Sequence, residues 1–180
     1  EELRADLVVL GGDVLDVELE EDTARILVAN LSGIKPPLGL YAVLGNHEYL
    51  CGAERSAALL ARAGATLLRD ELAQPVPGLY LAGRDDLSRR WRLSERRPLS
   101  GIVSGRDERS PLIVVDHQPS SPALAEAAAG GADLILSGHT HGGQLFPWNW
   151  VVRIFFSKIY GLYREGGAFV YVTSGAGTWG

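Results

Sequence analysis

The sequence lacks methionine altogether and holds a single cysteine, Cys51, among its 180 residues. One thiol cannot build an internal disulfide framework, so the small disulfide-rich folds are excluded. No run approaches the roughly 18 to 20 uninterrupted apolar residues of a membrane-spanning helix, and the first residues lack the pattern of a signal peptide. Because even residue 1 is Glu, we expect these residues to be a piece of a longer protein.

The chain also lacks an excess of basic residues. It has 17 Lys and Arg against 22 Asp and Glu, a formal net charge of −5, so a strongly basic nucleic-acid surface is not implied. With 46% apolar and 22% charged residues, the chain is too hydrophobic to be disordered. We therefore predict one domain over residues 1–180, with no nucleic acid polymer as a partner. Nothing in the sequence sets the oligomeric state.

Short apolar runs alternate with helical patterns along the chain. The apolar runs have the length of buried strands, and alternation of strands with helices favours an α/β layered fold. The predicted strands cover residues 6–11, 40–44, 66–69, 79–82, 112–116, 133–137 and 168–173, and the predicted helices cover residues 19–31, 54–63 and 122–129.

Residues 84–109, here called the Arg-rich insertion, interrupt this alternation. The insertion contains eight Arg residues, little apolar periodicity and several Ser, Gly and Pro residues. A solvated, mobile segment is the favoured interpretation. The alternative is a lid that grips an anionic substrate, since the guanidinium group matches phosphate oxygens in geometry.

All the histidines directly follow predicted strands, as does Asp13. Functional groups gather beyond the carboxyl ends of parallel strands, so we expect these side chains to form one site. Asp, Asn and His form a mixed oxygen and nitrogen ligand set that suits Mn, Fe or Zn better than Ca, and the absence of Cys ligands argues against a closed structural zinc site. Glycines permit tight turns, and they flank the candidates in three blocks: Gly11-Gly12-Asp13, Gly45-Asn46-His47 and residues 138–143. The histidines are His47, His117, His139 and His141.

The same residues lie in sequence blocks that resemble those of the calcineurin-like metallophosphoesterases. The blocks occur in the order of that family, and the resemblance spans residues 5 to 180. The blocks are Gly12-Asp13-Val14-Leu15-Asp16, similar to GDxxD; Gly45-Asn46-His47-Glu48, similar to GNHE; Asp116-His117-Gln118-Pro119, which supplies an intermediate histidine; and Gly138-His139-Thr140-His141, similar to GHTH. Residues 138–144, 160–163 and 174–180 resemble a bacterial branch that includes membrane-associated phosphoesterases and relatives of UDP-2,3-diacylglucosamine hydrolases.

The resemblance implies a two-layer β sandwich flanked by helices, the four-layer αββα metallophosphoesterase fold, with two divalent transition metal ions (Mn, Fe or Zn) at one edge. Carried over to this sequence, Asp13 would bridge both ions and His141 would bind the second ion. Three residues would complete the first site, namely Asn46, His117 and His139. A metal-bridging hydroxide would then attack the phosphorus.

The resemblance also implies roles for residues that are not ligands. His47 would protonate the leaving oxygen or stabilise the pentacoordinate phosphorus. Asp16 would orient a ligand or tether its loop, although a turn-stabilising role without any link to metal is an equal alternative. Glu48 and Asp116 are expected to support the site structurally.

The sequence departs from the family at one block. The family opens with an Asp-x-His block on its first strand, and no Asp-x-His occurs in these 180 residues. We therefore expect a sheet that lacks its first strand and exposes an edge. The first metal site keeps four ligands, whereas the second keeps only Asp13 and His141. We expect this chain alone to bind at most one metal tightly and to be weakly active or inactive.

The substrate expected from the resemblance is a phosphodiester or pyrophosphate, and the sequence leaves a lipid-linked molecule open. The alternatives are a nucleotide phosphodiesterase and a non-catalytic metal-binding scaffold. The aromatic segment 146–156 is read first as core or rim packing and second as a lip that meets an acyl chain or a membrane surface. We expect a bacterial protein whose domain is soluble, with membrane association or export supplied by a segment outside these residues.

Overall fold

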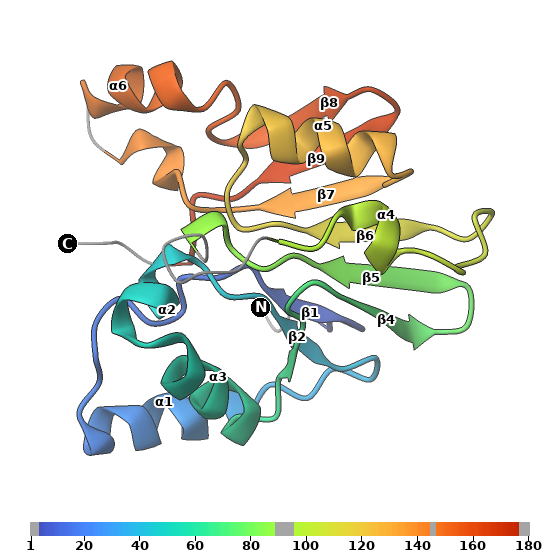
Figure 1. Cartoon of the computed structure of the whole chain (residues 1–180). Helices are drawn as coiled ribbons and strands as arrows, with labels where there is room; N and C mark the ends of the chain where they lie inside the picture. Colours follow the sequence, from blue (N-terminus) through green and yellow to red (C-terminus); the bar gives the residue numbers. More distant parts are fainter. Residues whose placement is uncertain (1–3, 89–95, 145–146, 177–180) are drawn as a thin grey trace.

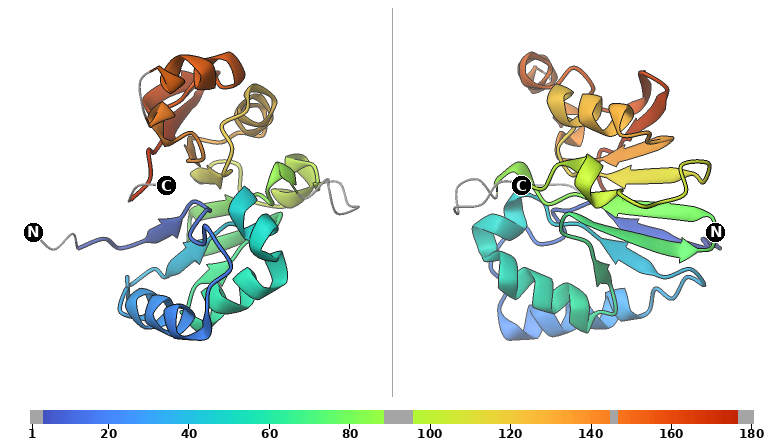
Figure 2. Two further views of the ribbon diagram at one scale, coloured as in Figure 1. Left: turned by 90° about the vertical axis from the view of Figure 1, so that its left-hand side faces the viewer. Right: turned by 45° about the vertical axis from the view of Figure 1, so that its right-hand side comes forward.

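The computed structural model describes residues 4–88, 96–144 and 147–176, and in it two β-sheets lie face to face between two layers of helices (Figure 1, Figure 2). The smaller sheet has the strand order β1-β2-β3, and all its strands are parallel. These strands are β1 (Val8–Leu10), β2 (Leu40–Ala42) and β3 (Thr66–Leu67). The predicted α/β class and two-layer sandwich are confirmed.

The larger sheet has the strand order β4-β5-β6-β7-β9-β8. Its four central strands are parallel, and the two outer strands run antiparallel to their neighbours. The strands are β4 (Glu71–Val76), β5 (Leu79–Gly83), β6 (Leu112–Val115), β7 (Leu134–Ser137), β8 (Gly161–Glu165) and β9 (Ala168–Val172).

Helices cover the outer face of each sheet (Figure 1). On the smaller sheet lie α1 (Glu21–Ser32) and α3 (Ala53–Arg62), and on the larger sheet lie α4 (Leu99–Ile102) and α5 (Ser121–Ala129). α5 starts where it does because the Ser120 side chain accepts a hydrogen bond from the Ala123 N–H and because Pro122 suits the first turn. None of the helices in the described part of the chain has the length and apolar character needed to cross a membrane.

The two sheets meet through a shared apolar layer. Its buried members are Val43, Leu68, Leu81 and Val115. At Gly83 the sheets approach so closely that an added Cβ would lie 2.2 Å from Cβ of Leu68. Only a residue without a side chain fits there, so Gly83 sets the spacing of the sheets beside the site.

The expected strands and helices are all present, with ends shifted by a few residues, but several elements had not been predicted. β4 contains Gln74 and Pro75, and β8 contains Arg164 and Glu165. Each lies at an edge of the sheet, where one side faces solvent and a continuous apolar run is not required. The unpredicted helices are short, and each forms where the larger fold places it. They are α2 (Asn46–Cys51), α4, α6 (Trp148–Phe155) and the 3₁₀ helix η2 (His141–Gly143).

β1 lies at an edge of the smaller sheet. Within the described residues it pairs only with β2, so its other side carries unpaired backbone groups. The Arg-rich insertion is described only at its two ends, because residues 89–95 lie outside the described residues. Its lid role stays a prediction.

Candidate metal centre

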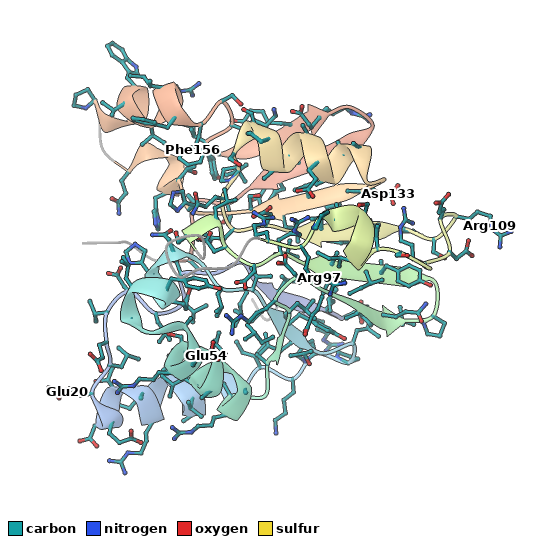
Figure 3. The ribbon with its side chains drawn as sticks, viewed as in Figure 1. Glu20, Glu54, Arg97, Arg109, Asp133 and Phe156 are labelled. Carbon is teal, nitrogen blue, oxygen red and sulfur yellow. The ribbon has the colours of Figure 1, made fainter. Side chains whose placement is uncertain are left out.

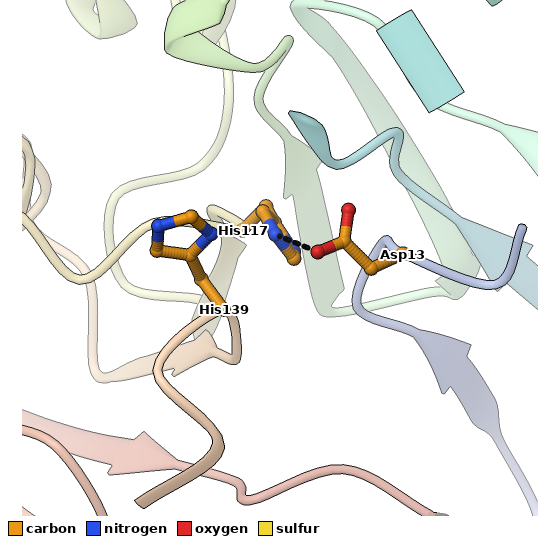
Figure 4. A group of neighbouring side chains, drawn as sticks. All are labelled: Asp13, His117 and His139. Carbon is orange, nitrogen blue, oxygen red and sulfur yellow. Dashed lines mark ion pairs between the residues drawn. The ribbon is translucent and has the colours of Figure 1, made fainter. Parts of the chain in front are cut away.

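Four side chains from four loops converge at the edge of the sandwich where the parallel strands end. Asp13 follows β1, Asn46 begins α2 shortly after β2, His117 follows β6, and His139 follows β7. The carboxyl ends of parallel strands lie side by side, which is why these groups collect there. In Figure 4 the side chains of Asp13, His117 and His139 lie next to one another, and each offers a ligand atom within 4.8 Å of the other two.

The polar atoms of this group are in contact. Nε2 of His117 lies 3.0 Å from Oδ2 of Asp13 and 3.2 Å from Oδ1 of Asn46. The same Asn46 oxygen lies 2.7 Å from Nδ1 of His139. Atoms bound to one metal ion at about 2.0 to 2.2 Å are themselves about 3 Å apart, so the observed spacing fits a shared cation.

The main chain orients His117 for such a role. Its Nδ1–H donates a hydrogen bond of 2.8 Å to the carbonyl oxygen of Gly11, and the residue is 1% exposed. A bond at one ring nitrogen fixes the tautomer and leaves the lone pair on the other, here Nε2. The converging set therefore consists of one carboxylate oxygen, one amide oxygen and two imidazole nitrogens, a combination that fits a divalent transition metal.

The protonation of these groups follows from their neighbours. Burial raises the pKa of Asp13, but the hydrogen bond and charge of His117 outweigh this and lower it overall. Burial lowers the pKa of His117, and Asp13 more than compensates, so the pKa is raised. Burial and the charge of His117 lower the pKa of His139 to about 4, which keeps this imidazole neutral at neutral pH. A metal ion bound here would compete with a proton for the Nε2 lone pair of His117.

The Glu48 side chain forms hydrogen bonds with the two loops that carry Asp13 and Asn46. Its carboxylate is fully buried and accepts four backbone N–H groups at 2.6 to 2.9 Å. Asp13 has a φ of 54°, in the left-handed region that residues with side chains rarely adopt, and Glu48 holds it there by binding its N–H and the next two. The fourth N–H belongs to Gly45, at the start of α2.

The glycines beside these residues are required by space. An added Cβ at Gly45 would lie 2.2 Å from Oδ1 of Asp13, and one at Gly12 would lie 2.6 Å from Nδ1 of His117. The Asp13 oxygen also accepts the backbone N–H of His47 at 2.9 Å. In the loops that carry Asp13, Gly45 and His117, the backbone of one loop therefore lies directly against a side chain of another. The glycines in these sequence blocks leave the space that this close approach requires.

His47 lies beside the group, and its side chain contacts Asp16. Its Nδ1 lies 2.6 Å from Oδ1 of Asp16 and 3.3 Å from the Asp16 carbonyl oxygen. Asp16 is half exposed and belongs to the loop after β1. Asp16 thus contacts the side chain of His47.

His141 is not part of the tight group. It lies in η2 with a φ of 48°, half-buried, and its ring faces the backbone of Gly175, where an added Cβ would lie 3.7 Å from Nδ1. Among the described residues, the group of ligand atoms within 4.8 Å of one another includes Asp13, His117 and His139 but not His141. The role of His141 in a second metal site stays a prediction.

The sequence indicated that Asp116 supports the site structurally, but it did not identify the partner of Asp116. Asp116 is buried and pairs with the Arg96 guanidinium at 2.5 Å, and burial raises the pKa of its carboxyl although Arg96 opposes this. Arg84, also buried, contacts Asp70 and Glu126. Two arginines of the Arg-rich insertion are therefore held in ion pairs within the fold, and one of them, Arg96, pairs with the neighbour of His117. A buried Asp next to His117 was the available signal, but its partner lies 20 residues away.

Comparison with known proteins agrees with the sequence blocks. Residues 1–143 match the model of the calcineurin-like phosphoesterase family. An uncharacterized metallophosphoesterase of Helicobacter pylori strain J99 is 36% identical over 179 residues, which cover 98% of this chain and 47% of the relative. The chain thus spans about half the length of this relative.

Other relatives have similar identity. An uncharacterized metallophosphoesterase of Aquifex aeolicus is 34% identical over 184 residues, which cover 98% of this chain and 67% of the relative. A transmembrane protein with metallophosphoesterase domain from Danio rerio is 34% identical over 192 residues, which cover 99% of this chain and 43% of the relative.

Proposed function

Because the chain belongs to the calcineurin-like phosphoesterase family, we propose that it is a metal-dependent hydrolase of phosphoester bonds. The observation that carries this proposal is the contact among lone-pair atoms of four side chains at the carboxyl ends of the strands. Those side chains belong to Asp13, Asn46, His117 and His139.

These four residues would hold a divalent transition metal ion. Once bound, such an ion would polarise a phosphoryl oxygen and lower the pKa of a bound water. Mn, Fe and Zn all suit the donor set. The second ion expected from the family stays part of the proposal, with Asp13 and His141 as its ligands in this chain.

His47 would act on the leaving group. Asp16 accepts a hydrogen bond from Nδ1–H, so Nε2 is the nitrogen that can exchange a proton with the substrate. His47 would therefore donate a proton to the leaving oxygen as the bond to phosphorus breaks.

The substrate we propose is a phosphodiester or pyrophosphate of a lipid-linked molecule. Two observations support this choice. The apolar helix α6 lies at the same edge as the candidate centre, and the Danio rerio relative is named a transmembrane protein.

The experiment that tests the function follows hydrolysis of bis-p-nitrophenyl phosphate and p-nitrophenyl phosphate, with and without manganese. It compares this chain with one extended at its N-terminal side to supply the Asp-x-His block. Asn46→Ala is expected to abolish turnover, whereas Asn30→Ala, which removes an exposed amide on α1, is expected to leave it unchanged. A folded, metal-loaded protein that hydrolyses neither ester would contradict the proposal and favour the scaffold alternative.

A further inference from the structure

The helix α6 presents an exposed apolar face. Trp150, Ile154 and Phe155 are 65%, 78% and 74% exposed, and Val151 beside them is also exposed. Spacings of one, four and five residues place these four side chains on one side of the helix, here called the α6 apolar face. Exposed apolar patches of this kind mark interaction surfaces.

The charge around α6 indicates what this face meets. The chain as a whole has a net charge of −5, yet residues 134–164 contain no Asp or Glu. The same stretch contains the cations Arg153, Lys158 and Arg164. Lys158 pairs with Glu165, whereas Arg153 is exposed on α6 and makes no ion pair within the described residues. An apolar face flanked by a cation in an otherwise acidic protein complements an anionic surface with an apolar interior.

The residues themselves match a helix that lies in a membrane interface. Such helices have aromatic and aliphatic side chains on one face and cations at its border. Trp prefers the boundary between lipid chains and headgroups, and Arg next to it interacts with anionic lipid. A lipid bilayer matches both the apolar and the cationic parts of this surface.

α6 is also connected to the candidate metal centre. Phe156, the residue directly after α6, packs edge to face against the His139 ring. The ring centroids are 5.2 Å apart and the ring planes make an angle of 68°. Figure 1 places α6, η2 and α2 at the same edge of the sandwich, and Figure 3 labels Phe156 between α6 and the strands. A surface that held α6 would therefore lie beside the candidate centre.

We propose that the α6 apolar face docks on a lipid bilayer that contains anionic lipids, so that the centre faces phosphoesters in the headgroup layer. The docking part of this proposal rests on the exposed α6 apolar face and on the positive charge around α6. The identification of headgroup phosphoesters as substrate rests in addition on the proposed function.

The test measures co-sedimentation of the 180-residue chain with vesicles, without metal or substrate. We expect binding to vesicles of phosphatidylcholine with phosphatidylglycerol, and weaker binding to phosphatidylcholine alone or at high salt. Ile154→Ser and Phe155→Ser should each reduce vesicle affinity by about tenfold, since each removes a large apolar side chain from the bilayer. Ile26→Ser, a matched change at a 63% exposed residue of α1, should leave affinity unchanged.

Several outcomes would overturn the docking proposal. These are no binding of the unaltered chain to either vesicle, an equal loss in Ile26→Ser, or a loss caused by Leu162→Ser on β8 and not by the α6 variants. All of these positions are exposed, so the variants are expected to fold, which circular dichroism checks. Vesicle binding by the 180-residue chain, together with no ester hydrolysis by the N-terminally extended chain, would reject the proposed function alone. Hydrolysis of a soluble diester by the extended chain without vesicle binding would reject docking alone.

Discussion

The carboxylate of Asp16 lies 2.6 Å from Nδ1 of His47, which joins the loop after β1 to the first turn of α2. The sequence left Asp16 between a role near the metal and a simple turn. Its partner in the structure is the histidine proposed to protonate the leaving oxygen. We therefore propose that Asp16 positions His47.

We expect Asp16→Asn to lower kcat by about 10- to 100-fold, because a neutral amide oxygen is a weaker acceptor for the Nδ1–H of His47 than a carboxylate and orients the ring less firmly. KM and metal affinity should change little. Asp22→Asn on α1 is the control, since Asp22 is exposed and pairs with Arg25, away from the site. An unchanged kcat in Asp16→Asn would argue that this carboxylate has only a turn-stabilising role.

Glu48 is expected to determine the stability of the site loops. In Glu48→Gln the amide NH₂ must face backbone N–H groups that now bind a carboxylate oxygen, so we expect a loss of about 3 kcal/mol in the free energy of unfolding. Urea denaturation followed by circular dichroism measures it. Glu54→Gln, at an exposed residue of α3, should cost under about 1 kcal/mol. Equal stability of both variants would show that the four hydrogen bonds contribute little.

Metal titration distinguishes the two histidines of one loop. By calorimetry with manganese or zinc we expect one tight site per chain. His139→Ala should weaken that site by at least about 100-fold, whereas His141→Ala should leave it intact, because only His139 belongs to the tight group. Metal at 100 times its Kd should add about 2.7 kcal/mol to stability, and a chelator should remove it. Two tight sites in this chain would contradict the expected stoichiometry.

The ion pair between Glu126 and Arg84 predicts that the free energy of unfolding depends on pH. Burial raises the pKa of Glu126, but the Leu99 N–H and Arg84 outweigh it and lower the pKa below the usual value of 4.5. A lowered folded-state pKa contributes stability that is present above pH 4.5 and lost as pH falls through the lowered value. We expect Glu126→Gln to lower the free energy of unfolding by about 1 kcal/mol at pH 7, a small effect because water screens a partly exposed pair. The difference from the unaltered chain should disappear as the pH falls from 4.5 through the lowered pKa.

Thermal unfolding between pH 3 and pH 7 measures this difference. Glu108→Gln, at an exposed residue, is the control and should match the unaltered chain at each pH. A deficit in Glu126→Gln that stays constant over this range would mean that packing, and not the charge of Glu126, causes it.

Local patterns in the sequence were sufficient for the central strands. β5, β6 and β7 contain no exposed residue, and strands buried on both faces need apolar residues throughout. In β9 buried and exposed positions alternate, and the exposed positions are the aromatic residues Phe169 and Tyr171. The sequence places four candidate ligands after predicted strands, namely Asp13, Asn46, His117 and His139. Because the carboxyl ends of parallel strands meet at one edge of a sheet, these residues were expected to lie together. The class of fold and the location of the candidate centre were therefore accessible from the sequence.

The contacts that complete the site were decided by the tertiary structure. Glu48 binds N–H groups more than 30 residues away, Arg96 pairs with Asp116 across 20 residues, and Asp16 meets His47 across 31. No local pattern encodes these partners, because each depends on how separate loops pack once the sheets are face to face. The sequence by itself determined which residues stand at the strand ends, and only the packing of the two sheets decided which of them touch, since contact depends on distance in space and not along the chain.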